Sequence, residues 1–239
     1  MTANIKPQLE ALITILDVEL EDVLIDICEK NHMPIALFTY GQGSVKSKFF
    51  EMLGYGGPRK IVSISINTNK MCRFVMNRLN SEIDLQRPGT GIVFTINISS
   101  ISRILSKVCM DGDEKLGIGS ENVIVTSKEP YHLIIAIVNS GHFDQVMDAA
   151  KAAGANGGTL IHARSIGSKE AIKYLGITVQ PEKDLVLILT RQENKLAIME
   201  SVVAKAGLST SAAGYCFSLP VNDVMGVEAV IDNFDELID

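Results

Sequence analysis

Hydrophobic residues in this chain fall in short runs, and the period of hydrophobic and polar positions changes from one run to the next. Residues 12–16 form an apolar run typical of a strand, and residues 19–30 then place apolar side chains at helical spacing. Residues 60–66 alternate Ile or Val with Ser, as a strand with two unlike faces does. The elements predicted in this first half are strands at 12–16, 35–40, 60–66 and 91–98 and helices at 19–30 and 67–81.

The same order returns in the second half of the chain. Residues 12–17 (LITILD) correspond to residues 134–139 (IIAIVN), and the pair Leu53-Gly54 corresponds to Leu175-Gly176, so the offset is 122 in both cases. The elements predicted here are strands at 132–138, 158–163, 183–189 and 214–221 and helices at 143–153 and 194–206. A register that holds across several elements indicates one module that was duplicated and fused.

The order βαββαβ is that of the split-βαβ, ferredoxin-like module, in which four antiparallel strands carry two helices on one face. We therefore predict an α+β chain of two tandem ferredoxin-like modules with antiparallel sheets. The expected domains are a first module at 9–98, a connector at 99–130, a second module at 131–227 and an acidic tail at 228–239.

Two further structural expectations concern the connector and the sheets. Ile101, Ile104, Leu105 and Val108 predict one amphipathic helix in the connector, followed by a polar turn at 111–115. Residues 185–189 are apolar without alternation, which indicates a strand covered on both faces. Because one module cannot cover its own open face, this pattern favours packing of sheets against other modules.

Composition and charge exclude several classes of protein. The chain has 239 residues, enough for two domains, and its mean hydropathy of +0.21 comes from short runs, none of which approaches the roughly 18–20 apolar residues of a membrane span. Residues 1–17 lack the basic start of a signal peptide. A net charge of −6 without a basic stripe disfavours direct binding to nucleic acid. The cysteines stand singly, as reduced thiols of a cytoplasmic protein do: Cys28, Cys72, Cys109 and Cys216.

Catalytic motifs do not occur in the sequence. The four histidines show no metal-ligand spacing, and neither a G-x-S-x-G elbow, a Walker A loop nor a motif that places paired carboxylates is found. We therefore expect a protein that is not an enzyme.

Two segments of the second module resemble the P-II nitrogen-regulatory signalling family. Residues 157–169 (GGTLIHARSIGSK) are similar to the second strand and loop base of that family, and residues 214–223 (GYCFSLPVND) are similar to its last strand. The first module resembles the family only through residues 91–94 and the shared order of elements.

The resemblance implies a sensor made of ferredoxin-like modules packed around an axis. Members of the family bind adenine nucleotides in clefts between modules, with 2-oxoglutarate beside the nucleotide, and contact partner proteins through a long loop. For this chain the resemblance implies that there is no resident cofactor. It implies that ATP, ADP or 2-oxoglutarate acts as the effector and that the protein has a role in nitrogen metabolism. The partner-binding loops would be 41–58 and 165–181. Three chains would supply six modules, and both a trimer and a dimer of tandem pairs remain open.

The candidate ligand-binding residues follow from the same positions. Gly167 falls on the loop-base glycine that approaches the nucleotide, Lys169 lies near the effector-binding position, and Gly214 falls on the glycine that lets the last strand pass close to the phosphates. The full set is Arg164, Gly167, Ser168, Lys169, Gly214 and Tyr215.

The sequence also departs from the family. Tyr215 stands where the family has a phosphate-binding lysine, and Met225 and Gly226 stand in a region where the family has arginines. Losing charged phosphate contacts costs roughly 1.5–3 kcal/mol each. An oligomeric interaction scaffold that has lost nucleotide binding is therefore the alternative function.

Overall fold

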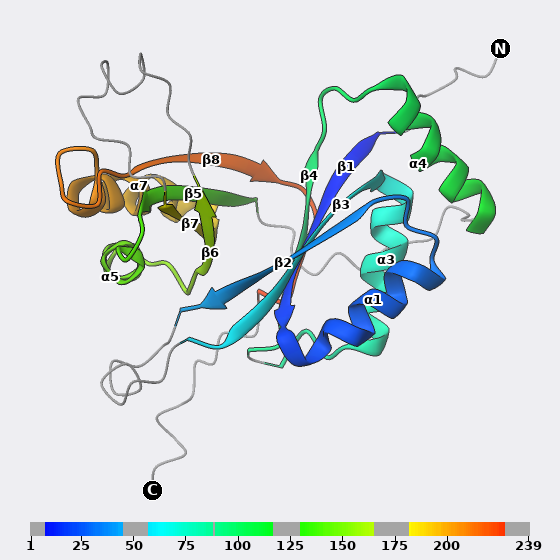
Figure 1. Cartoon of the computed structure of the whole chain (residues 1–239), viewed down its shortest axis with the longest axis horizontal. Coiled ribbons are helices and arrows are strands. Elements are labelled where there is room, and N and C mark those ends of the chain that lie inside the picture. The colour runs from blue at the N-terminus through cyan, green and yellow to red at the C-terminus, as the bar shows by residue number, and fades with distance from the viewer. Residues whose placement is uncertain (1–7, 45–56, 88, 117–129, 165–181, 228–239) are drawn as a thin grey trace, which may run out of the picture. The chain divides into compact units, whose positions relative to one another are not determined.

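The computed structural model describes residues 8–44, 57–87, 89–116, 130–164 and 182–227 (Figure 1). These residues form two compact units, one drawn from 1–39, 61–128 and 221–239 and the other from 40–60 and 129–220. The units follow the two repeats except at two places. Residues 40–60 are assigned to the second unit, and the segment that begins at Val221 is assigned to the first.

The two modules contain the same elements in the same order. Corresponding strands begin at nearly constant distances along the chain, since β5 starts 122 residues after β1, β7 starts 123 after β3, and β8 starts 124 after β4. The first module consists of β1 (Leu9–Asp17), the short 3₁₀ helix η1 (Val18–Leu20), α1 (Glu21–Lys30), β2 (Ala36–Gly43), β3 (Arg59–Thr68), α3 (Asn69–Glu82) and β4 (Gly91–Asn97). The second consists of β5 (Tyr131–Asn139), α5 (Phe143–Ala152), β6 (Thr159–Arg164), β7 (Glu182–Arg191), α7 (Gln192–Ala206) and β8 (Tyr215–Val221).

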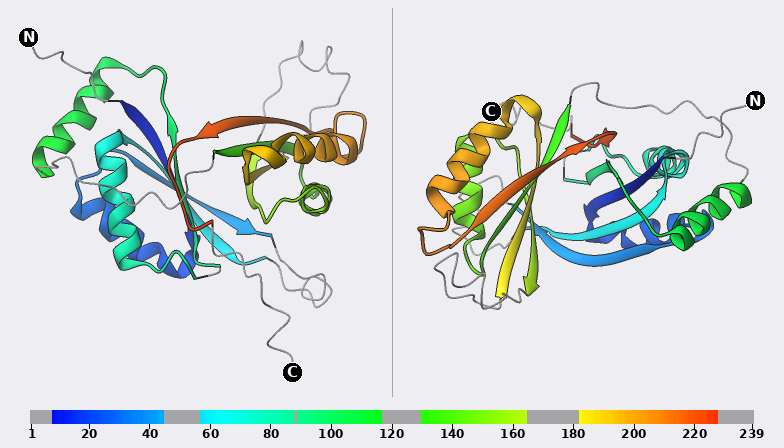
Figure 2. Two further views of the ribbon diagram at one scale, coloured as in Figure 1. Left: turned by 180° about the vertical axis from the view of Figure 1, so that it is seen from behind. Right: turned by 90° about the horizontal axis from the view of Figure 1, so that it is seen from above.

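Strand order confirms the predicted fold class. The order is β2-β3-β1-β4 in the first module and, read from the other side, β8-β5-β7-β6 in the second, so each third strand lies between the first two. The pairs β1–β4, β5–β7 and β6–β7 are antiparallel. Figure 2 shows α1 and α3 together against one face of the first sheet. Both modules are therefore ferredoxin-like.

Short polar contacts set where the helices begin and end. Thr68 caps α3 by accepting a hydrogen bond from the Met71 N–H at 3.1 Å, and Asp17 accepts from the Glu19 N–H at 3.2 Å, where η1 begins. Gly154, with φ of +98°, follows α5 in the left-handed conformation that favours glycine.

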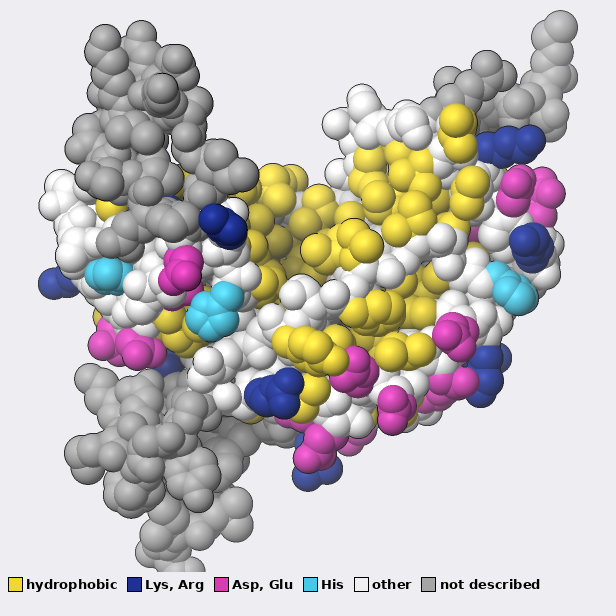
Figure 3. All heavy atoms as spheres, in the orientation of Figure 1, with side chains coloured by type: hydrophobic (Ala, Val, Ile, Leu, Met, Phe, Trp, Pro, Cys, Tyr) yellow, Lys and Arg dark blue, Asp and Glu magenta, His cyan; other side chains and the backbone are white. Residues whose placement is uncertain are grey.

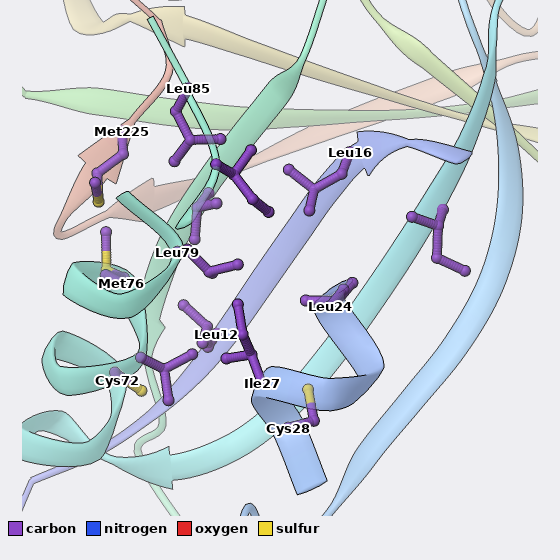
Figure 4. Close-up of a cluster of buried hydrophobic side chains, with 14 of the residues drawn as sticks. Leu12, Leu16, Leu24, Ile27, Cys28, Cys72, Met76, Leu79, Leu85 and Met225 are labelled. Carbon is purple, nitrogen blue, oxygen red and sulfur yellow. The ribbon is translucent and has the colours of Figure 1, made fainter. Parts of the chain in front are cut away.

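Each module buries its own hydrophobic core between the sheet and the two helices. In the first module, Leu12 and Leu16 of β1 lie near the side chains of α1 and α3 (Figure 4). The second core uses smaller side chains, with four alanines from α5 and its surroundings and β5 Ala136. The fully buried residues of the second core are Ile134, Ala136, Val146, Ala150, Val186, Ile188, Ile198 and Ala212.

The segment after β8 adds a strand to the first module. Val224 and Met225 form β9, which pairs antiparallel with β4, and Met225 enters the first core (Figure 4). Backbone bonds extend this pairing, because Asn222 N–H donates to Thr95 O at 2.9 Å and Thr95 N–H donates to Asp223 O at 3.0 Å. The end of the second repeat is thus built into the first unit.

The predicted loop 41–58 was wrong at its start, because β2 continues to Gly43. Gly43 N–H donates to Pro58 O at 2.8 Å, and Gln42 and Gly43 pair with Leu160 and Thr159 of β6 within the second unit. These pairings hold the strand extended past Tyr40. Residues 45–56 of that loop lie outside the described residues.

The predicted polar turn at 111–115 was also wrong, because these residues form the last part of α4 (Arg103–Leu116). Asp113 accepts hydrogen bonds from Thr68 Oγ1 at 2.7 and 2.8 Å, and the buried Cys109 thiol lies 3.4 Å from Ile66 O. Ile104 and Val108, expected on the inner face of this helix, are exposed. The contacts of Cys109 and Asp113 with the first module decide which face is covered.

Apolar side chains also reach the surface along the edge of the first module. Leu37 of β2 is 64% exposed, and Phe38 and Ile64 are exposed as well. Figure 3 shows hydrophobic side chains gathered along the path of β2. Surface of this kind is common at sites of association between proteins.

None of the helices in the described part of the chain has the length and apolar composition that a membrane crossing requires.

The four thiols are expected to react slowly while the protein is folded. All four are free, and burial raises the pKa of each, that of Cys28 to about 11. Because the thiolate is the reactive species, labelling of Cys28 with iodoacetamide at pH 8 should be about a hundredfold slower than in the urea-unfolded protein. Mass spectrometry of timed samples measures this. A thiol labelled equally fast in both states would contradict the burial described here.

Candidate functional site

The candidate site lies at the edge of the second sheet where β6 ends and β7 begins. Residues 165–181, which follow Arg164 and precede Glu182, lie outside the described residues, and Arg164 and Glu182 are paired across the two strands. Next to this pair, His162 lies opposite Asp184, and on the other side of β7 Lys183 lies opposite Asn139, the last residue of β5. We call Asn139, His162, Lys183 and Asp184 the loop-root cluster.

Lys183 is a buried cation whose hydrogen-bond partner is neutral. Its side chain is 5% exposed, and Nζ donates to Asn139 Oδ1 at 2.5 Å. No ion pair to Lys183 occurs among the residues that the structure describes. Burial lowers the pKa of Lys183, because an ammonium group loses hydration without gaining a full counter-charge. An ammonium group has three N–H donors, so Lys183 keeps donors that can meet an anion.

Asp184 holds the backbone around the cluster. Its carboxylate is 1% exposed and accepts from Gly141 N–H at 2.9 Å, from Ser140 Oγ at 3.3 Å and from His162 Nδ1 at 3.0 Å. The His162 side chain itself is largely exposed. Asp184 therefore joins the turn after β5 to the end of β6, and it fixes the strands on either side of Lys183.

The loop before β8 lies against the end of β5. Asn139 N–H donates to Ala212 O at 2.8 Å, and Asn139 Nδ2 donates to Ser211 O at 3.0 Å. Close approach is possible because position 214 is glycine. A Cβ atom there would lie 2.3 Å from Ala206 O and 2.6 Å from Val138 Cγ1. Asn139 thus links this loop to Lys183.

Three of the predicted residues lie at the same end of the strands of the second module, although they come from different strands. Arg164 is the exposed last residue of β6, Gly214 lies against the end of β5, and Tyr215 is the exposed first residue of β8. Gly167, Ser168 and Lys169 lie outside the described residues, so their predicted roles remain predictions.

Sequence reasoning missed the loop-root cluster. Lys183 and Asp184 open a strand that is otherwise apolar, and a charged strand end is commonly only solvated. One signal was present, since Lys60 occupies the corresponding place in the first repeat, 123 residues earlier. A lysine that both repeats keep at the start of their third strand indicates a shared role.

Among the described residues, no group of three or more His, Cys, Asp or Glu side chains could hold a metal ion. The loop-root cluster buries one positive charge, Lys183, and one negative charge, Asp184. Asp184 already accepts three hydrogen bonds, whereas the ammonium group of Lys183 keeps donors beyond its bond to Asn139, so the remaining donors suit an anion.

A protein-family model matches the part of the chain that contains this site. Residues 131–229 match the family model described as "Nitrogen regulatory protein P-II". The second module belongs to the P-II family. The match begins at β5 and includes every described residue named in the loop-root cluster. The first module shares the strand order of this P-II module but lies outside the match.

Solved structures give weaker likenesses. PII of Arabidopsis thaliana bound to citrate is 22% identical and covers 39% of this chain and 79% of its own, with a TM-score of 0.31. The divalent ion tolerance protein CutA1 of Ehrlichia chaffeensis is 15% identical and covers 44% of this chain and 95% of its own, with a TM-score of 0.35. No curated protein matches the chain. Because both TM-scores are low, the fold assignment rests on the strand order within each module.

Proposed function

We propose that this chain is a P-II-like signal-transduction protein whose P-II module binds a small anionic effector at the loop-root cluster. The observation that carries the proposal is the buried Lys183, which has a neutral partner and lies beside the root of the 165–181 segment. An anion at this position would gain a charge-assisted hydrogen bond from Lys183 in a poorly hydrated place, where such bonds are strongest.

Three further features favour an adenine nucleotide or 2-oxoglutarate as the effector. Arg164 supplies a second positive charge at the same sheet edge, and Gly214 leaves room for close approach to the backbone before β8. The family match supports ligands of this class. Binding at the root of 165–181 would link the ligand to the partner contacts proposed for that segment.

Regulation in nitrogen metabolism and assembly into a trimer or dimer belong to the same proposal. Tyr215 and Phe217 of β8 are 44% and 43% exposed, and Leu185, Leu187 and Leu189 of β7 are half-buried. Apolar sheet surface of this kind is suited to contact with another copy of the module. The proposed partner-binding segments are 44–58, which follows β2, and 165–181.

One observation favours the alternative of a scaffold without nucleotide binding. Tyr215 is exposed at the position where the family has its phosphate-binding lysine, and a phenol cannot replace an ammonium charge. The two functions differ in their response to small anions.

We expect ligand-dependent stabilisation that requires Lys183. ATP, ADP, AMP and 2-oxoglutarate would be added separately to the full chain, and one of them should raise Tm by roughly 3 °C or more at tenfold excess over its Kd. Lys183→Met should abolish the rise, because it removes the buried donor, and Arg164→Ala and Lys169→Ala should weaken it. Differential scanning fluorimetry provides the measurement.

Lys195→Ala is the matched control. Lys195 lies near His132, at the opposite end of β5 from Asn139, and should leave the response unchanged. No rise with any of the four ligands, from a protein that remains folded and oligomeric, would favour the scaffold. A rise that survives Lys183→Met would place the effector elsewhere.

A further inference from the structure

A row of polar side chains crosses the first module under its helices. Glu10 of β1 lies directly opposite Asn97 of β4. On the other side of β1, Asn69 N–H donates to Gln8 O at 2.9 Å. The corresponding bond in the second module runs from Gln192 N–H to Pro130 O, and it continues the antiparallel register of β5 and β7, in which His132 lies opposite Thr190. The same register places Asn67 of β3 opposite Glu10. Directly opposite residues share a face, so Asn67, Glu10 and Asn97 form one row, called the Glu10 row below.

Two oxygen atoms of this row are buried without a hydrogen-bond donor among the described residues. They are Glu10 Oε2 and Asn67 Oδ1. Glu10 is 4% exposed, its other oxygen, Oε1, accepts from Asn222 Nδ2 at 3.3 Å, and the Thr95 side chain also hydrogen-bonds to this carboxyl group. Asn67 is fully buried, and its Nδ2 donates to Ser65 Oγ at 3.0 Å. A buried acceptor without a donor destabilises the folded protein, so two on neighbouring strands indicate a missing donor or cation.

The segment after β8 closes the row. Asn97 Nδ2 donates to Asn222 Oδ1 at 3.0 Å, and Arg73 of α3 pairs with Asp223 at 3.3 Å. Asp223 is itself buried. With Glu10 ionised, Glu10 and Asp223 carry two negative charges and Arg73 one positive charge. The cluster therefore has a net charge of −1, and burial raises the pKa of Glu10.

The fold does not require this row, as the second module shows. At the corresponding positions the second module has His132 for Glu10, Thr190 for Asn67, Leu196 for Arg73 and Val221 for Asn97. The same strand order is thus built there without the buried carboxylate and both amides. The Glu10 row is a property of the first module's own sequence.

We propose that the Glu10 row binds one monovalent cation between Glu10 and Asn67. A single positive charge neutralises the cluster, and the carboxylate and amide oxygens without donors are ligands for an alkali ion and acceptors for an ammonium ion alike. A divalent ion would leave an excess positive charge beside Arg73. Within the described residues no group of three or more His, Cys, Asp or Glu side chains supports one either.

Thermal unfolding of the full chain tests the site. The protein is dialysed into N-methyl-D-glucamine chloride, whose cation is too large for a buried site, and this salt is replaced by NaCl, KCl or NH₄Cl at constant ionic strength. Tm should rise by roughly 3 °C when the bound cation is tenfold above its Kd. A response to KCl or NaCl identifies an alkali-ion site, and a response to NH₄Cl alone identifies an ammonium site.

Two variants make the result specific. Glu10→Gln has nearly the same shape but no charge, and it should abolish the dependence on the cation. His132→Gln, at the corresponding position of the second module, should keep it. Calorimetric titration of the responding cation should give one site per chain in the wild type and no heat in Glu10→Gln.

Two outcomes would overturn the proposal. If wild-type Tm is equal in all four salts, the Asn67 amide or a water donates to Glu10 and no cation is bound. If Glu10→Gln keeps the full dependence, the cation binds elsewhere.

Discussion

Replacing Gly214 with alanine is expected to destabilise the second module by about 3 kcal/mol. The new Cβ would lie 2.3 Å from the backbone oxygen of Ala206 and 2.6 Å from Val138 Cγ1, so relief requires movement of α7 or β5. Gly91→Ala should have a similar effect in the first module. Its Cβ would lie 2.2 Å from Ile15 O, and its φ of +151° adds strain. Urea unfolding, followed by circular dichroism, measures both changes.

Gly141→Ala is the control for this prediction. Gly141 also has a positive φ, +88°, but a Cβ there meets nothing within 4 Å, so only backbone strain of about 1 kcal/mol is expected. A Gly214→Ala protein no less stable than Gly141→Ala would contradict the packing of the loop before β8 against β5.

Replacing Asp184 with alanine is also expected to reduce the free energy of unfolding by about 3 kcal/mol. The change removes the buried acceptor of Gly141 N–H, Ser140 Oγ and His162 Nδ1, and it leaves the backbone N–H of Gly141 without its partner. The strands around Lys183 lose their connection at the same time. The free energy of unfolding in urea is again the measurement.

Two variants separate the buried carboxylate from its exposed partner. Asp184→Asn keeps one acceptor oxygen and should cost less than Asp184→Ala. His162→Ala removes a largely exposed ring and should cost below about 0.5 kcal/mol. Equal costs for Asp184→Ala and His162→Ala would show that the contacts with Gly141 and Ser140 carry no stability.

The duplicated fold was predictable because hydrophobic period and repeat offset reinforce each other. Leu12 and Ile134 begin corresponding apolar runs in the two repeats. Each lies on the first strand of its module and is buried in that module's hydrophobic core. The period of apolar positions distinguishes a strand from a helix without reference to tertiary contacts. The element order follows from it, and the order βαββαβ admits few arrangements.

Features set by tertiary contacts were not predictable in the same way. The sequence around Gly112 and Asp113 is typical of a turn, yet Asp113 continues α4 because Thr68 donates to it from 45 residues away. Ser63 and Ser65 form a small polar face in the sequence pattern. They are 2% and 1% exposed because this face, with Ile61, turns toward the helices.

The candidate site likewise contains a residue that the sequence identified and a residue that it did not. Gly214 was identified from its resemblance to a family position, and its close contacts agree with a need for glycine. Lys183 was missed because charge at a strand end gives no sign of burial. Its partner Asn139 ends a strand 44 residues earlier, so only the folded register brings the two together.

Calorimetric titration of the effector into the full chain tests whether a small anion binds at the loop-root cluster. ATP, ADP and 2-oxoglutarate would be titrated separately into wild type, Lys183→Met and Lys195→Ala. We expect at least one ligand to bind wild type and Lys195→Ala equally, and we expect Lys183→Met to lose at least tenfold in affinity. Equal affinity of Lys183→Met and wild type, or no binding of any ligand to the folded wild-type protein, would contradict a sensor that works through the loop-root cluster.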